Sequence, residues 1–186
     1  IKQQLEAIGY TASSHPAPSQ AQVTVYDPAR ALNGLNLYAS WHAPEAILMD
    51  MRGKVLHTWR YAFEEVWPAP ESRAEIDHPD FWRRVRLLED GHLLAIYEGY
   101  GLIRVDAASN LVWAYPGKCH HDLDVSGEGK IYVLIREAKR LPRVHPSEPV
   151  LEDGIAVLDR NGRELAKYSI LECFENSYYA PLLRNL

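Results

Sequence analysis

Two consecutive histidines are the residues of this sequence best suited to chemistry. They occur in the run Cys119-His120-His121-Asp122. A neutral imidazole is a nucleophile near pH 7, and a side chain of this kind can carry a transferred group. Arg83 and Arg84 form a second polar pair, whose guanidinium groups could bind an anion. His42, in a Trp-His-Ala-Pro segment, is a weaker candidate for the same ligand site.

Each of these residues also has an ordinary structural explanation. Asp122 or Asp124 could hydrogen-bond the two histidines, and arginines of this kind often pair with carboxylates on neighbouring strands. Because adjacent residues of a strand point to opposite faces, His120 and His121 are not expected to coordinate the same metal ion. We therefore expect neither a metal nor a cofactor.

Short strands are the elements that must position these residues, and their turns repeat. Three segments begin with an aspartate and carry an aromatic residue nine positions later: Asp50–Trp59, Asp106–Tyr115 and Asp159–Tyr168. An apolar run precedes each of them. The pattern predicts a hairpin in which the aspartate caps the turn and Gly or Asn adopts a left-handed backbone conformation.

A second repeated unit, a strand, an acidic-glycine turn and another strand, precedes two of these hairpins. It occurs at Val85–Tyr97 and again at Leu123–Ile135. The sequence thus predicts one set of three strands and two sets of four, at residues 35–40, 45–50 and 54–61, then 82–88, 92–98, 101–106 and 111–116, then 120–126, 130–136, 154–159 and 164–170.

Four antiparallel strands in roughly 40–50 residues are the unit of a β-propeller. The predicted fold is therefore all-β, with about three to four four-stranded blades over residues 23–186. A β-sandwich is the alternative. The insertions at 62–80 and 138–153 are predicted to be loops, and the tail 171–186 could begin another blade. Residues 1–22 are predicted to form a short helix and a linker.

The predicted blades are few for a closed ring, since propellers use about 4–8 blades and this chain supplies about three to four. The predicted blades form an incomplete or split ring, and we favour a piece of a longer propeller. A completing chain or a homo-oligomer would also close it. Propeller ligands bind where the innermost strands converge. Alignment of the turns places His121 opposite Arg83 and Asp122 opposite Arg84 on two such strands.

The residues His120-His121-Asp122-Leu123 through Leu134, and Ala46–Asp50 with Gly53–Trp59, resemble the arylsulfate sulfotransferase-like β-propellers of bacteria. The resemblance covers about residues 35–170. It implies a six-bladed propeller exported to the periplasm. It also implies PAPS-independent transfer of a sulfuryl group between phenols through a sulfated histidine. His120 or His121 would then be an auxiliary channel histidine, with the nucleophile in a later blade.

A non-catalytic extracytoplasmic propeller, serving as a scaffold or interaction subunit of a larger assembly, is the alternative function. Composition argues against several other classes of protein. The formal net charge is −5 and the basic residues are dispersed, which argues against a nucleic-acid partner. No apolar run approaches the ~18 residues of a membrane span. Cys119 and Cys173 form no metal-binding motif and could be two thiols or one disulfide.

Overall fold

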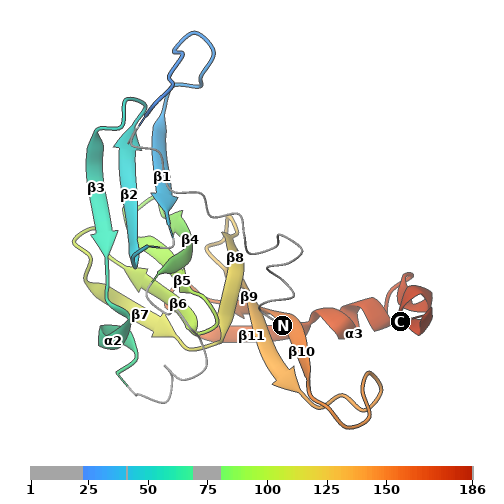
Figure 1. Ribbon diagram of the computed structural model, residues 1–186. Helices are drawn as coiled ribbons and strands as arrows, with labels where there is room; N and C mark the ends of the chain where they lie inside the picture. Colours follow the sequence, from blue (N-terminus) through green and yellow to red (C-terminus); the bar gives the residue numbers. More distant parts are fainter. Residues whose placement is uncertain (1–22, 41, 69–80, 186) are drawn as a thin grey trace, which may run out of the picture.

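The computed structural model describes residues 23–40, 42–68 and 81–185. The predicted N-terminal helix and linker, residues 1–22, lie outside the described residues. Eleven strands dominate the described part of the chain, and they form three antiparallel sheets. The three sheets follow one another along the chain, from blue through green to red (Figure 1).

Every sheet is a meander, because the order of its strands is the order of the chain. The first sheet contains β1 (Leu35–Ala39), β2 (Glu45–Asp50) and β3 (Val55–Arg60). The second contains β4 (Trp82–Leu87), β5 (Leu93–Tyr97), β6 (Gly101–Val105) and β7 (Leu111–Tyr115). The third contains β8 (Cys119–Val125), β9 (Ile131–Lys139), β10 (Val150–Leu158) and β11 (Glu164–Ser169). The bounds of the strands agree closely with the sequence-based ranges, except that β9 and β10 are longer by a few residues at their shared hairpin.

Successive meanders of this kind are the blades of a propeller, so the prediction of an all-β, propeller-like fold is confirmed. The aspartate hairpin joins β2 to β3, β6 to β7 and β10 to β11. By this equivalence β4 and β8 are innermost strands, and they contact each other. Within the described residues, the first sheet has no counterpart of these two strands.

The hairpin turns have the predicted chemistry. The Oδ1 atom of Asp50 accepts the backbone N–H groups of Arg52 and Lys54, at 2.8 and 2.9 Å. Asp106 and Asp159 accept the equivalent pairs at 2.8 to 3.0 Å. The left-handed residue lies three positions after each aspartate. In the second turn it is Ser109, with a φ of 65°, and not the expected Asn110.

Neighbouring blades are joined by a repeated hydrogen bond that the sequence had not suggested. The seventh residue after the hairpin aspartate donates to the backbone of the next blade. His57 Nε2 donates to the carbonyl of Ala107 at 2.9 Å, and Trp113 Nε1 donates to the carbonyl of Arg160 at 3.1 Å. In both cases the acceptor directly follows the next hairpin aspartate. The two blade interfaces are therefore constructed alike.

The core consists of two apolar clusters, one between the first two sheets and one between the last two. The second sheet contributes to both, and every residue of β5 is buried. The short helix α2 (Phe63–Val66) closes the first cluster, since Phe63 packs edge-on against Tyr97 and Tyr100. The predicted blade strands thus enclose two apolar clusters, with the second sheet between them.

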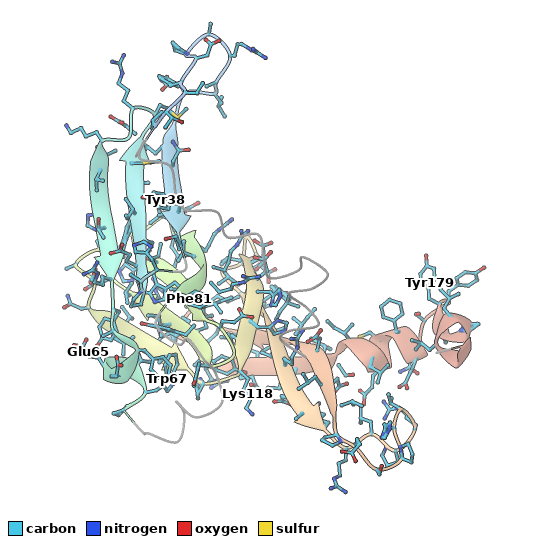
Figure 2. The ribbon with its side chains drawn as sticks, viewed as in Figure 1. Tyr38, Glu65, Trp67, Phe81, Lys118 and Tyr179 are labelled. Carbon is cyan, nitrogen blue, oxygen red and sulfur yellow. The ribbon has the colours of Figure 1, made fainter. Side chains whose placement is uncertain are left out.

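Two sequence expectations are wrong. The insertion at 138–153 is not wholly a loop, because β9 and β10 extend their pairing to Lys139 and Val150. The tail is helical and begins no blade: it forms α3 (Ile170–Glu175) and the 3-10 helix η2 (Ala180–Asn185). This tail projects away from the sheets, and Tyr179 lies near its far end (Figure 2). Within the described residues, no helix has the length and apolarity needed to cross a membrane.

Candidate functional site

A bulge interrupts each of the two innermost strands at the same place in the blade. In β4 it lies between Trp82 and Arg84, and in β8 it lies between Cys119 and Leu123. A bulge leaves the extra residues unpaired and redirects their side chains. Arg83, His120 and His121 all fall at these bulges, so both strands present polar groups where their ladders are broken.

His121 has a left-handed backbone, with a φ of 59°. This conformation turns its ring toward that of His120, so that the two imidazoles meet edge to face with centroids 4.8 Å apart. Their Nδ1 atoms are 2.8 Å apart. The expectation that the two rings lie on opposite faces is therefore wrong. Strict alternation holds for a regular strand, and the bulge removes that regularity.

Glu98 holds His121 at two points. One carboxylate oxygen accepts the backbone N–H of His121 at 3.0 Å, and the other lies 3.1 Å from its Nδ1 atom. Glu98 lies in the turn between β5 and β6, which is bonded to the start of β8. Gly99 donates to the carbonyl of Cys119 at 2.8 Å, and Lys118 donates to that of Tyr100 at 2.9 Å. The turn and the inner strand therefore form one support for the histidine pair.

His120 is buried, with 6% of its side chain exposed. Its Nε2 atom lies 3.4 Å from Asp153 but has no hydrogen-bond partner. Burial, aided by the nearby Arg136 guanidinium, lowers the pKa of His120, so the ring is neutral at pH 7. Asp153 is held by Arg136 at 2.7 and 3.3 Å, and these bonds lower the pKa of its carboxyl.

One distribution of protons fits the contact between the two rings and the contact of His121 with Glu98. His120 carries its proton on Nε2, facing Asp153, and its Nδ1 accepts. His121 carries its proton on Nδ1, shared between His120 and Glu98. The Nε2 atom of His121 then keeps its lone pair, on a side chain that is 49% exposed. His121 thus has the reachable nucleophilic atom, and the other three residues orient it.

The predicted ligand-binding residues do not all gather here. Arg83 belongs to the cluster, with its Nε atom 3.7 Å from the Glu98 carboxylate. Arg84 instead forms an ion pair with Asp122 at 2.9 Å, which joins β4 to β8. His42 has its partners in its own segment: Ser40, and Glu45 at 2.9 Å. The structure does not bring His42 into contact with the histidine pair.

Glu98, Arg136 and Asp153 were missed in the sequence. Glu98 lies in a turn, and nothing local distinguishes it from other acidic turn residues. Arg136 and Asp153 are directly opposite each other in the β9–β10 ladder, across a long hairpin. Their pairing could have been found only by extending both strands into the 138–153 insertion. The register of that extended hairpin places Arg136 opposite Asp153.

The cysteines give no disulfide, because both Cys119 and Cys173 are free. Cys119 is buried beside the histidines, and this burial raises the pKa of its thiol. It therefore stays protonated and is a poor nucleophile. Cys173 is exposed on α3.

A hollow of about 480 Å³ lies elsewhere between the second and third sheets. Its lining includes Arg86, Arg104 and Arg160, together with Asp90. Arg104 is paired with Asp90 at 2.5 Å and also donates to the carbonyl of Arg160 at 3.0 Å. Arg104 in this hollow is therefore already engaged in structural contacts. The histidine cluster is the stronger candidate site.

Comparison with known proteins gives no family. No family model matches the chain, and no curated protein matches it. One similar solved structure is a protein of unknown function from Bacteroides caccae, with 11% identity and a TM-score of 0.45 over 73% of this chain. Another is BamB from Moraxella catarrhalis, with 10% identity and a TM-score of 0.32 over 73% of this chain. The chain spans 46% and 47% of their lengths. The fold description therefore rests on the chain's own topology.

Proposed function

We propose that this chain is part of an extracytoplasmic propeller that transfers a sulfuryl group between phenols through His121. The arrangement of His121 carries the proposal: a carboxylate fixes its Nδ1–H and its backbone N–H, and its Nε2 is left reachable. A carboxylate that holds one imidazole nitrogen sets the tautomer and stabilises the imidazolium that forms during reaction. The resemblance of the His120–Leu134 segment to arylsulfate sulfotransferases supplies the substrate class.

The reaction has two balanced steps. In the first, the Nε2 lone pair of His121 attacks the sulfur of an aryl sulfate. The bond from sulfur to the aryl oxygen breaks, and the oxygen leaves with the electron pair and takes a proton from water. In the second, the hydroxyl of an acceptor phenol loses its proton to water, and its oxygen attacks the sulfur. The nitrogen–sulfur bond then breaks, and its electron pair returns to Nε2.

The residues around His121 have matching roles. Glu98 balances the positive charge of the sulfated imidazole, which keeps its Nδ1 proton. His120 is neutral and accepts a share of that same proton, so it orients the ring without adding charge. The guanidinium of Arg83 lies beside Glu98 and could bind the sulfuryl oxygens. His121 therefore has the role of nucleophile and His120 that of a positioning residue, whereas the family resemblance gives either histidine an auxiliary role.

The test is turnover of 4-nitrophenyl sulfate with a phenol acceptor. We expect nitrophenol release that is abolished in His121→Ala and reduced by roughly 100-fold or more in Glu98→Gln. His145→Gln, which alters an exposed histidine of another hairpin, should keep full activity. Mass spectrometry of the quenched wild-type protein should find one sulfuryl group on the peptide that contains His121. Equal turnover in His121→Ala, or no turnover by the folded protein, would contradict the proposal.

A second candidate function is a non-catalytic assembly subunit, and one comparison within the chain favours it. The aromatic residue nine positions after the hairpin aspartate is buried in the first two blades, where Trp59 and Tyr115 are 3% and 8% exposed. Its counterpart in the third blade, Tyr168, is 54% exposed. This face of the third sheet is suited to receive further blades, from this protein or from another chain.

A further inference from the structure

The same cluster offers three metal-binding side chains within a small space. Among the described residues, Glu98, His120 and His121 form the one group of three or more such side chains whose ligand atoms all lie within 4.8 Å of one another. We infer that these three residues bind a divalent cation of the zinc type. The inference rests on this geometry and on no step of the sulfuryl transfer.

The donor set and its spacing fit such an ion. Two imidazoles and a carboxylate are a common set for zinc sites that keep a position open. With zinc–ligand distances of about 2.0–2.1 Å, tetrahedral ligand atoms lie about 3.3 Å apart. The Nδ1 atoms of the two histidines are 2.8 Å apart, and that of His121 is 3.1 Å from Glu98. Shifts of a few tenths of an ångström at these two pairs would therefore bring them to the ligand spacing, and all the ligand atoms lie within 4.8 Å of one another.

The surroundings of His120 supply the independent support. A histidine that binds a metal through one nitrogen usually presents the other to a carboxylate, which fixes the ring. The Nε2 atom of His120 is buried without a hydrogen-bond partner and faces Asp153 at 3.4 Å. Arg136 in turn fixes that carboxylate through two bonds. A cation on Nδ1 would complete this arrangement, with the Nε2–H group of His120 directed toward the Asp153 carboxylate.

Zinc binding through Nδ1 of His121 would move the proton of that neutral ring from Nδ1 to Nε2. Zinc binding should therefore release no proton from the neutral ring, but it should weaken in acid, because a protonated imidazole cannot coordinate the ion. It should also compete with the proposed transfer chemistry, because His121 needs its Nδ1 proton to keep a lone pair on Nε2. A bound cation would act as an inhibitor of the transferase and not as its cofactor.

The experiment is a calorimetric titration of Zn²⁺ into the purified protein after treatment with a chelator. Cys173→Ser serves as the background, so that its exposed thiol does not contribute. We expect one Zn²⁺ per chain, bound at least 10-fold more weakly in His121→Ala and in Glu98→Gln. His145→Gln should bind like the background protein.

No aryl sulfate is present in this titration, so its outcome is separate from that of the transfer assay. Absence of stoichiometric binding would overturn the inference, as would binding that is equal in the background protein, His121→Ala and Glu98→Gln. Glu98→Gln keeps the size and the hydrogen-bonding oxygen of the side chain. Loss of binding in that variant, with an unchanged circular dichroism spectrum, therefore reports a lost ligand and not a lost fold.

Discussion

Three non-glycine residues among those described have a left-handed backbone, and two of them lie at the histidine pair. Ser109 lies in a hairpin turn, whereas Lys118 and His121 lie on either side of His120. This conformation costs an ordinary residue about 1–2 kcal/mol, so the surrounding contacts must enforce it. Lys118 is held by the carbonyl of Tyr100, and His121 by Glu98. The strain is thus concentrated where the chain brings its most reactive side chains together.

The burial of His120 predicts how stability depends on pH. Its pKa is lowered in the folded protein, by burial first and then by Arg136, and Asp153, His121 and Glu98 face the same ring. The unfolded chain therefore takes up a proton first, below about pH 6.5. Stability should be fully present above that pH and should fall as the pH drops toward the folded-state pKa.

Thermal unfolding of wild type and of His120→Asn between about pH 7.5 and 5, on either side of the ordinary histidine pKa, measures this effect. The variant should lose part of the decline in melting temperature, whatever its stability at neutral pH. The carboxyl of Asp153 titrates only in stronger acid, because its pKa is lowered, and it stays outside this window. Titration of the His120 ring at its ordinary pKa, observed by NMR, would refute the prediction.

Residue spacing predicted three of the residues that gather at the candidate site: His120, His121 and Arg83. Alignment of two turns brought the histidine pair and Arg83 to equivalent places on neighbouring inner strands, which the structure bears out in the paired bulges. It did not yield Glu98 or Asp153. These carboxylates reach the histidines through a turn docked on β8 and through a long ladder, and both contacts depend on tertiary packing. Residue spacing also wrongly placed the rings of His120 and His121 on opposite faces of the strand, because strict alternation does not reveal a bulge.

At the scale of elements, the hairpins were predictable because their causes are local. An aspartate and a left-handed residue three positions later are enough to close each turn. The helical tail has a comparable local signal. Ser169 accepts the backbone N–H of Glu172 at 2.9 Å, and a serine followed three residues later by glutamate is typical of a helix start.

Gly162 connects a turn to a blade interface and gives a test of both. Its φ is 77°, and a Cβ atom there would lie 2.6 Å from the ring of Trp113 in the preceding blade. We expect Gly162→Ala to lower the free energy of unfolding by about 1–2 kcal/mol or more, since backbone strain and a steric conflict act together. Urea denaturation measures the change.

Gly127→Ala is the matched control for Gly162→Ala. It lies in another turn, without a positive φ, and a Cβ atom there would meet nothing within 4 Å. The control should change stability by less than about 0.5 kcal/mol. Equal effects of the two substitutions would show that the Trp113 contact does not constrain the turn.

At the scale of the whole molecule, the three sheets form a series whose two ends differ from its middle. The second sheet is covered on both sides, and its β5 strand is buried throughout. Within the described residues, β1 has a paired neighbour on one side only, and its Leu35 and Tyr38 are exposed. Tyr38 is labelled on β1 in Figure 2. At the other end Tyr168 of the third sheet is exposed, whereas its counterparts Trp59 and Tyr115 in the first two sheets are buried. Both ends are therefore suited to further pairing or packing.

This asymmetry predicts association through the third sheet. The repeated interface places Trp59 and Tyr115 under the following blade, so Tyr168 should pack in the same way against a further blade. We expect the 186-residue chain to form dimers or larger species in sedimentation velocity, and Tyr168→Lys to shift it toward monomer. Tyr178→Lys changes a tyrosine of the tail that is 92% exposed, and it should have no such effect. A monomeric wild-type chain, or equal association of the two variants, would show that Tyr168 does not lie in an interface. The assembly role would then lose its support, whereas the chemistry of His121 would be unaffected.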